Sequence, residues 1–310
     1  MRRFTATFRT DLLCLVLAAL SAAGCSSEMV PPSREVDPFI GTGGHGHTYP
    51  GATVPFGMVQ VSPDTRLDGW DGCGGYHITD DVVYGFSHTH LQGTGVSDYG
   101  DVLLMPTVGP MDTGGVWRER YRDRFVEGSQ EAHAGYYRCA LERSGVEVEL
   151  TASDRVGHHR WTLEKRDTLQ LIVDLAHRDE LINYGMYPLD DSTLVGQRVS
   201  DNWAEEQHVY FAMRFSRPFE WLDQMAELET NEVNGNLEQE LSFVPIFSMA
   251  FKDVESVEAR VSLSFVDIEG AVQNLNTEAP KSLGFDAALE AAEGRWDGAL
   301  SRIEIVEDDA

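Results

Sequence analysis

The chain has 310 residues, of which 42% are hydrophobic and 24% are charged, and its formal net charge is -27. A surface with this excess of acid repels phosphate backbones and anionic lipid headgroups, which argues against a nucleic-acid-binding protein and against membrane binding through a basic patch. Neutral ligands such as sugars meet no such repulsion, and the length is sufficient for one large all-β domain.

The amino-terminal segment is typical of an export signal. Arginines precede an apolar run over residues 12–23 that is too short to span a bilayer permanently, and small residues come directly before Cys25. We therefore predict a lipoprotein signal peptide over residues 1–24, lipidation of Cys25 and a tether over residues 25–34. The mature chain would have 21 basic and 50 acidic side chains and would be an exported lipoprotein of the outer membrane, attached through its lipid only and facing either the periplasm or the cell surface.

Residues 41–100 contain 14 of the 29 glycines and 5 of the 10 histidines. Clustered glycine predicts main chain that approaches a ligand closely, although turns and bulges in a β-rich domain would also use it. Within this segment Trp70 stands between Gly69 and Asp71. This favours an indole ring presented over a sugar face beside a carboxylate that accepts hydroxyl hydrogen bonds; the alternative is an aromatic plug beneath the loop.

Short apolar runs separated by polar turns continue to about residue 268. They predict a mainly-β domain over residues 35–282, with antiparallel sheets packed as a sandwich. The expected strands include residues 102–108, 146–150, 159–163, 169–175, 208–215, 246–251 and 261–266.

Apolar residues then recur at steps of three and four from Phe285 to Ile303. They predict an amphipathic helix in a linker over residues 283–310. Such a helix either packs back onto the sandwich or leads into a further domain.

Loop carboxylates are numerous in the glycine-rich third. Glycoside hydrolysis needs two of them at a defined separation, but spacing along a chain cannot select the pair, and loop aspartates most often cap turns. The candidates are Asp64, Asp68, Asp71, Asp80, Asp81, Asp98 and Asp101.

Two histidine pairs, His45 with His47 and His88 with His90, suggest a possible metal site. Residues i and i+2 of a strand face the same side, so either pair can offer two imidazoles to zinc. No third ligand stands at a suitable spacing, which favours histidines that bond substrate hydroxyls or backbone carbonyls. No acidic twelve-residue calcium loop is present.

Besides Cys25, the mature chain would contain only Cys73 and Cys139. These do not form a disulfide framework, and a bridge between the two remains open.

Several motifs resemble the amino-terminal domain of glycoside hydrolase family 92, the exo-acting α-mannosidases. The likeness extends from about residue 35 to the end and rests on residues 36–42 (VDPFIGT), 50–58 (PGATVPFGM), 69–76 (GWDGCGGY), 85–95 (GFSHTHLQGTG), 135–137, 149–152 and 264–266.

The resemblance implies a galactose-mutarotase-like β-sandwich followed by a larger (α/α)6 barrel, inversion at the anomeric carbon, and a need for calcium. It also implies that the general acid, the general base and the calcium ligands lie mainly in the barrel, which this chain lacks. We therefore expect no catalytic or metal-binding residue here, no cofactor held by this chain alone, and no activity of the chain alone.

What carries over is a contribution to the pocket for a mannose-containing glycan. The substrate-binding residues expected from the resemblance are Trp70, Asp71, His88 and His90, with Phe56, Gly57 and Cys73 lining the pocket. The barrel is the expected partner and nucleic acid is not. Two other classes stay open: a stand-alone carbohydrate-binding surface lipoprotein, and a metal-dependent hydrolase that uses the paired histidines.

Overall fold

The computed structural model describes residues 30–67, 69–109, 117–233 and 236–303. The predicted signal peptide, the lipidation site Cys25 and the first half of the tether lie outside these residues. Across the described parts of the chain, no helix is long and apolar enough to cross a membrane. From Pro32 onward the chain forms one unit.

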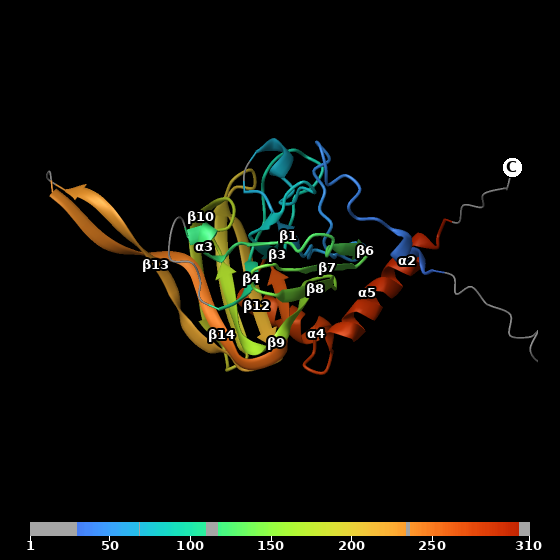
Figure 1. Cartoon of the computed structure of the whole chain (residues 1–310). Coiled ribbons are helices and arrows are strands. Elements are labelled where there is room, and N and C mark those ends of the chain that lie inside the picture. The colour runs from blue at the N-terminus through green and yellow to red at the C-terminus, as the bar shows by residue number, and fades with distance from the viewer. Residues whose placement is uncertain (1–29, 68, 110–116, 234–235, 304–310) are drawn as a thin grey trace, which may run out of the picture. The chain divides into compact units, whose positions relative to one another are not determined.

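Antiparallel strands dominate this unit (Figure 1), which confirms the predicted mainly-β class. Among the described residues, twelve strands belong to one hydrogen-bonded sheet whose main path is β1-β3-β4-β9-β14-β12-β11-β10. Their bounds are Ser62–Asp64 (β1), Gly85–Ser87 (β3), Leu103–Val108 (β4), Val156–Asp174 (β9), Asn236–Ser264 (β14), Gln207–Phe215 (β12), Thr193–Asp201 (β11) and Glu180–Pro188 (β10). Outside the main path lie β6 (Glu131–His133), β7 (Tyr136–Ala140), β8 (Val146–Ala152) and β13 (Glu220–Val233).

Two long strands, β9 and β14, run through both halves of the sandwich. The first half of β9 pairs with β8 and its second half pairs with β4, while β14 pairs with β9 over nearly the whole length of β9. Strands that pass from one sheet portion to the other form the corner of such a sandwich. The end of β14 pairs with β12, and its beginning forms a hairpin with β13 that extends beyond the rest of the sheet (Figure 1).

Each of these long strands contains two of the predicted strands. The polar run at residues 164–168 indicated a break, but it stays extended because it lies opposite an equally polar stretch of β14 near Asp253. Arg166 Nη1 lies 3.3 Å from Asp253 Oδ2 across this corner. Polar composition at the bend therefore reflects solvent exposure and not a chain reversal. Strands β10, β11 and β13 were not among the predicted strands; β10 is an edge strand with side chains exposed on both faces, so it lacks a clean alternation.

The main hydrophobic core lies between the two curled portions of the sheet. Trp161 and Leu171 of β9, Phe211 of β12 and Phe251 of β14 belong to it and are fully buried. Burial of apolar area on this scale is the main stabilising contribution to the fold.

Helix α4 (Ile268–Glu278) was not predicted. Asp267 caps its N-terminus by accepting a 2.6 Å hydrogen bond from the Gly270 amide. Ala271 and Leu275 pack against a small apolar cluster that includes Val195 and Ala212. The helix covers one face of β11, β12 and β14.

Helix α5 (Phe285–Leu300) confirms the predicted amphipathic helix, and of the two expected arrangements it packs onto the sandwich. Phe285, Ala288 and Ala292 are buried, and Trp296 Nε1 donates a 2.7 Å hydrogen bond to Thr53 O. The short helix α2 (Pro32–Glu35), in the last residues of the predicted tether, bonds to α5 through the Ser33 amide and Asp297. The remaining elements are the 3-10 turn η1 (Trp70–Gly72), helix α3 (Trp117–Tyr121), and the two-stranded sheet of β2 (Val82–Val83) with β5 (Asp123–Arg124).

Candidate functional site

Three glycine-rich loops meet at one surface of the sandwich. These rim loops are residues 41–48, 69–76 and 91–97. The Gly93 amide donates a 2.8 Å hydrogen bond to His47 O, which joins the first loop to the third. The buried Arg178 joins the second loop to the third, because Nη2 donates to Gly72 O at 3.1 Å and to Ser97 Oγ at 2.5 Å.

Trp70 stands at the surface of this rim, with 61% of its area exposed. It begins the turn η1, which follows Gly69 in the left-handed region at φ 84°. Its indole ring rests on Gly95, where any Cβ would overlap the ring, and meets His47 edge-on with centroids 5.1 Å apart. The exposed ring is thus held from two loops, which excludes the aromatic plug considered from the sequence.

Asp71 is the carboxylate beside this ring, and two imidazoles converge on its Oδ1. His45 Nδ1 lies 2.5 Å away and His47 Nε2 lies 4.0 Å away. The hydrogen bond from His45 lowers the pKa of Asp71, so the group is a carboxylate at neutral pH. His47 has φ of 55°, a left-handed conformation that is costly for a side chain with a Cβ and is found preferentially at functional sites. The sequence analysis had considered these histidines as zinc ligands or as groups that bond substrate hydroxyls or backbone carbonyls, and had not predicted their contact with Asp71.

His88 and His90 lie beneath the rim and are buried. His88 Nδ1 donates to Val102 O at 2.7 Å, and its Nε2 lies 2.9 Å from His159 Nε2. Burial lowers the pKa of His88 to about 4. His90 Nδ1 donates to Gly74 O at 2.9 Å, so this ring holds the Trp70 loop from below.

Asp64 is part of the same supporting layer. It is fully buried and accepts a 2.5 Å hydrogen bond from Ser87 Oγ, and its Oδ1 lies 3.5 Å from His177 Nε2. Desolvation by burial opposes ionisation of Asp64, but electrostatic interactions with His177, His90 and Arg178 outweigh it, and the pKa is lowered. Gly75, at φ 89°, passes directly over this carboxylate, and a Cβ there would overlap Asp64 Oδ1.

Other candidate carboxylates have structural partners. Asp80 pairs with Arg66 at 2.8 Å, Asp81 pairs with Arg124, the buried Asp98 accepts from the Tyr99 and Ala204 amides, and the buried Asp101 pairs with Arg198. Asp68 lies outside the described residues. Among the described candidates, only Asp71 combines a solvent-accessible position with the aromatic rim.

The three predicted lining residues lie in different environments. Cys73 is buried in the Trp70 loop, where desolvation raises the pKa of its thiol. Phe56 is fully exposed, and Gly57 packs on Ser153 and Asp154 in the β8–β9 turn. The adjacent Pro55 O accepts a 2.6 Å hydrogen bond from Arg295 of α5, so Phe56 and Gly57 are held by α5 and not by the rim loops.

Cys73 and Cys139 are both buried and unpaired, which answers the question of a bridge. In the described ranges, no group of three His, Cys, Asp or Glu side chains is arranged to hold a metal ion. The paired histidines therefore form no three-ligand site there.

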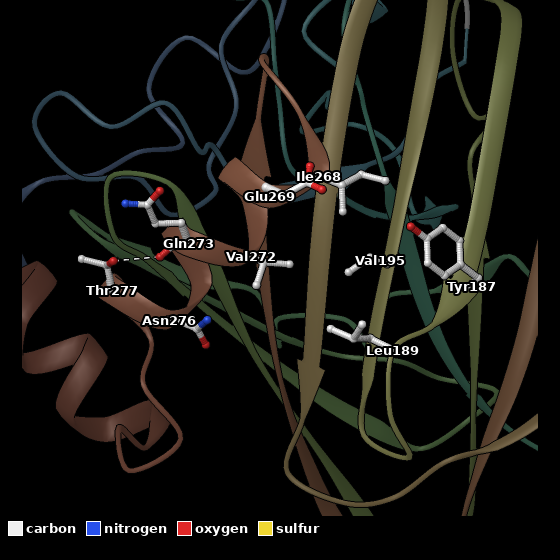
Figure 2. Close-up of a pocket in the computed structure, with 9 residues that line it drawn as sticks. All are labelled: Tyr187, Leu189, Val195, Ile268, Glu269, Val272, Gln273, Asn276 and Thr277. Atoms are coloured by element: carbon white, nitrogen blue, oxygen red, sulfur yellow. Dashed lines mark hydrogen bonds between the residues drawn. The ribbon is translucent and has the colours of Figure 1, made fainter.

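A separate groove of about 510 Å³ runs between α4 and the β10–β11 hairpin (Figure 2). Tyr187, Leu189 and Val195 face Ile268 and Val272 across it, and none of its lining residues belongs to the rim loops.

Comparison with known proteins decides the family. The description "Glycosyl hydrolase family 92 N-terminal domain" applies to a family model that matches residues 35–264. The chain belongs to this family. The rim loops and both long strands fall largely within the matched region of the GH92 domain.

Relatives agree with this assignment. A GH92 α-mannosidase of Bacteroides thetaiotaomicron, solved in complex with mannoimidazole, is 29% identical with a TM-score of 0.78, and the alignment covers 90% of this chain and 38% of that chain. The inverting GH92 mannosidase of Bacteroides thetaiotaomicron VPI-5482 shares the fold at 23% identity, a TM-score of 0.69, and coverage of 87% and 36%. A curated protein of Arthroderma benhamiae called an uncharacterized secreted glycosidase is 26% identical over 300 residues, covering 88% of this chain and 38% of that protein. The chain thus spans well under half of the length of these relatives.

Proposed function

We propose that this GH92 domain supplies one wall of the substrate pocket of an inverting exo-α-mannosidase that degrades mannose-containing glycans. Family membership and the mannosidases among the structural relatives support the reaction class. The role that we propose for this domain, substrate binding, is argued from the rim loops.

The single observation that carries this proposal is the exposed Trp70 ring on a loop fixed from below. His90 holds Gly74, and Arg178 holds Gly72, on either side of Cys73. An exposed indole ring leaves apolar surface in water, which a stacked sugar can cover. Because the loop that carries the ring is already rigid, binding a ligand costs little conformational entropy of the protein. We assign Trp70 to stacking on the leaving-group sugar and Asp71 to accepting its hydroxyl hydrogen bonds.

We give the other predicted residues different roles within the pocket. His88, His90 and Cys73 are buried, so we propose that they shape the loop that presents Trp70. Phe56 and Gly57 stand beside α5, and we propose that they line the pocket where the rest of the enzyme meets this domain.

Bond cleavage requires an acid and a base roughly 6.5 to 9.5 Å apart in an inverting enzyme. Of the described loop carboxylates, only Asp71 lies at the rim surface without an arginine ion pair, so no second carboxylate is available there to complete such a pair. We therefore propose that cleavage depends on residues outside this chain. The 310-residue chain should not hydrolyse an aryl α-mannoside, and turnover by that chain alone would contradict this part of the proposal.

The secreted relative and the amino-terminal pattern together support export of this protein as a lipoprotein anchored through Cys25. Mass spectrometry of the amino-terminal peptide tests this. A diacylglyceryl group on Cys25 is expected, and an unmodified cysteine or an uncleaved signal would contradict it.

The binding role is tested with Trp70→Ala in the complete protein that carries this chain. Loss of a rigid aromatic contact should raise KM for a manno-oligosaccharide about tenfold. Tyr187→Ala is the matched control, because Tyr187 is 51% exposed but lines the groove beside α4. Equal KM values for Trp70→Ala and the control would contradict the assignment of Trp70 to sugar stacking.

A further inference from the structure

A second exposed tryptophan, Trp203, stands on the turn that joins β11 to β12. It is 65% exposed, a little more than Trp70, and sequence analysis had not singled it out. A single exposed aromatic side chain needs no explanation by itself, so the role of Trp203 depends on how the turn that carries it is held.

The turn that carries Trp203 is fixed on both sides of the ring, before it to the last residue of the third rim loop and after it to the residue that follows that loop. Before it, Asn202 Nδ2 donates to Ser97 O at 2.6 Å and to Asp179 Oδ1 at 2.9 Å. After it, the Ala204 amide donates to Oδ2 of the buried Asp98 at 2.7 Å. Trp203 is therefore held in place by contacts more than 100 residues away in the sequence.

Both exposed indoles are attached to the same short segment. Trp70 rests on Gly95, and the Trp203 turn is bonded to Ser97 and Asp98. Two residues of chain span at most about 7 Å, so the attachment points of the two rings are separated by little more than the length of one sugar residue.

The surroundings of Trp203 indicate which ligand it contacts. Asp201, Asn202, Glu205 and Glu206 flank it and are exposed. The core of a protein interface is depleted of charged residues, and the acidic surface repels anionic lipids, whereas a neutral saccharide matches an indole face ringed by hydrogen-bond acceptors.

We propose that Trp203 forms a second aromatic platform, which binds a sugar residue beyond the one contacted by Trp70 in a neutral oligosaccharide. This inference rests on the proposed function of the rim. It predicts that the enzyme prefers longer glycans, because a second weak contact on one ligand acts at high effective concentration.

The test compares kcat/KM for a mannotetraose and a mannobiose, measured with the complete protein. In Trp203→Ala the ratio of the two values should fall about fivefold, which is the loss expected from one exposed aromatic contact. Trp203→Phe keeps an aromatic face and should recover at least half of the ratio. Tyr187→Ala, the exposed aromatic beside α4, should keep the wild-type ratio.

Two results would overturn the inference. A wild-type ratio in Trp203→Ala would show that the ring contacts no distal sugar. A loss of thermal stability with an equal loss of kcat/KM on both substrates would show instead that Trp203 packs against another protein surface. If Trp70→Ala leaves KM unchanged, the proposed function of the rim fails. If Trp70→Ala raises KM but Trp203→Ala leaves the kcat/KM ratio unchanged, only the inference about Trp203 fails.

Discussion

The surface of the rim and the layer directly beneath it contain the same residue types in opposite roles. At the surface, the exposed His45 and the half-buried Asp71 form a pair beside Trp70. Beneath it, Asp64 and His90 are buried; His90 bonds the loop that carries Trp70, and Gly75 of that loop passes over Asp64. The comparison teaches that, in this glycine-rich segment, depth decides whether an imidazole or a carboxylate can meet a ligand.

The two layers also differ in energetic weight. Groups in the lower layer are desolvated, so removing one partner leaves an unpaired polar atom at a cost of about 1–3 kcal/mol. The Asp71–His45 pair is screened by water and contributes little to stability. Substitutions below should therefore affect folding, and substitutions above should affect binding.

Two glycines offer the sharpest contrast and the largest expected effect. Gly75 and Gly69 both have positive φ, but a Cβ at Gly75 would overlap Asp64, whereas Gly69 has open space around it. Gly75→Ala should lower the free energy of unfolding by about 3 kcal/mol or more, from strain plus displacement of a buried carboxylate. Gly69→Ala should cost less, about 1–3 kcal/mol of backbone strain, because its φ of 84° and ψ of 159° suit only glycine. Urea denaturation of the complete protein measures both, and equal losses would contradict the layered arrangement.

The buried His88 predicts a pH dependence of stability. Burial lowers its pKa from 6.5 to about 4 in the folded protein. The unfolded chain then binds more protons between these two values, so stability is present above about pH 6.5 and is lost as the pH falls toward 4. From pH 7 to pH 5 this loss amounts to about 2 kcal/mol.

His88→Asn tests this prediction, because the amide can still donate to Val102 O but does not titrate. The variant should lose about 2 kcal/mol less than the wild-type protein between pH 7 and pH 5. Identical pH dependence in the two proteins would show that His88 is not the group responsible.

The smallest effect on folding is expected at Asp71. Asp71→Asn removes the charge that His45 bonds, but the pair is screened by water, so the free energy of unfolding should hardly change. KM for a manno-oligosaccharide should nevertheless rise, because the side chain loses an acceptor oxygen beside Trp70. A large loss of stability with unaltered KM would place Asp71 in the supporting layer.

Much of the fold was predictable from local pattern. The strand predicted at β8 and the helix predicted from Phe285 were confirmed, because the alternating Val146, Val148 and Leu150 enter the core and the apolar face of α5 is buried. Helix α4 was missed because it has few apolar residues and so gives only a weak periodic pattern. These residues stabilise the helix because they pack against Val195 and Ala212 of neighbouring strands. The corner of β9 and β14 was missed because polar composition does not distinguish an exposed bend from a turn.

For the site, the residue types of the rim were recognisable, but their depth was not. Trp70 and His88 lie in the same glycine-rich segment, yet one is exposed and the other fully buried. The contacts that distinguish them, such as Arg178 with Gly72 and Asn202 with Ser97, join residues about 100 positions apart. No spacing rule within the segment could have predicted these partners.

By itself, the sequence determined the acidic composition, the mainly-β architecture, helix α5 and the family, since these depend on composition, periodicity and contiguous motifs. Only the tertiary structure decided which imidazoles and carboxylates reach the surface, and that Trp203 stands beside the rim. The physical reason is that solvent access and long-range hydrogen bonds arise when distant segments pack, and a linear pattern carries no measure of either.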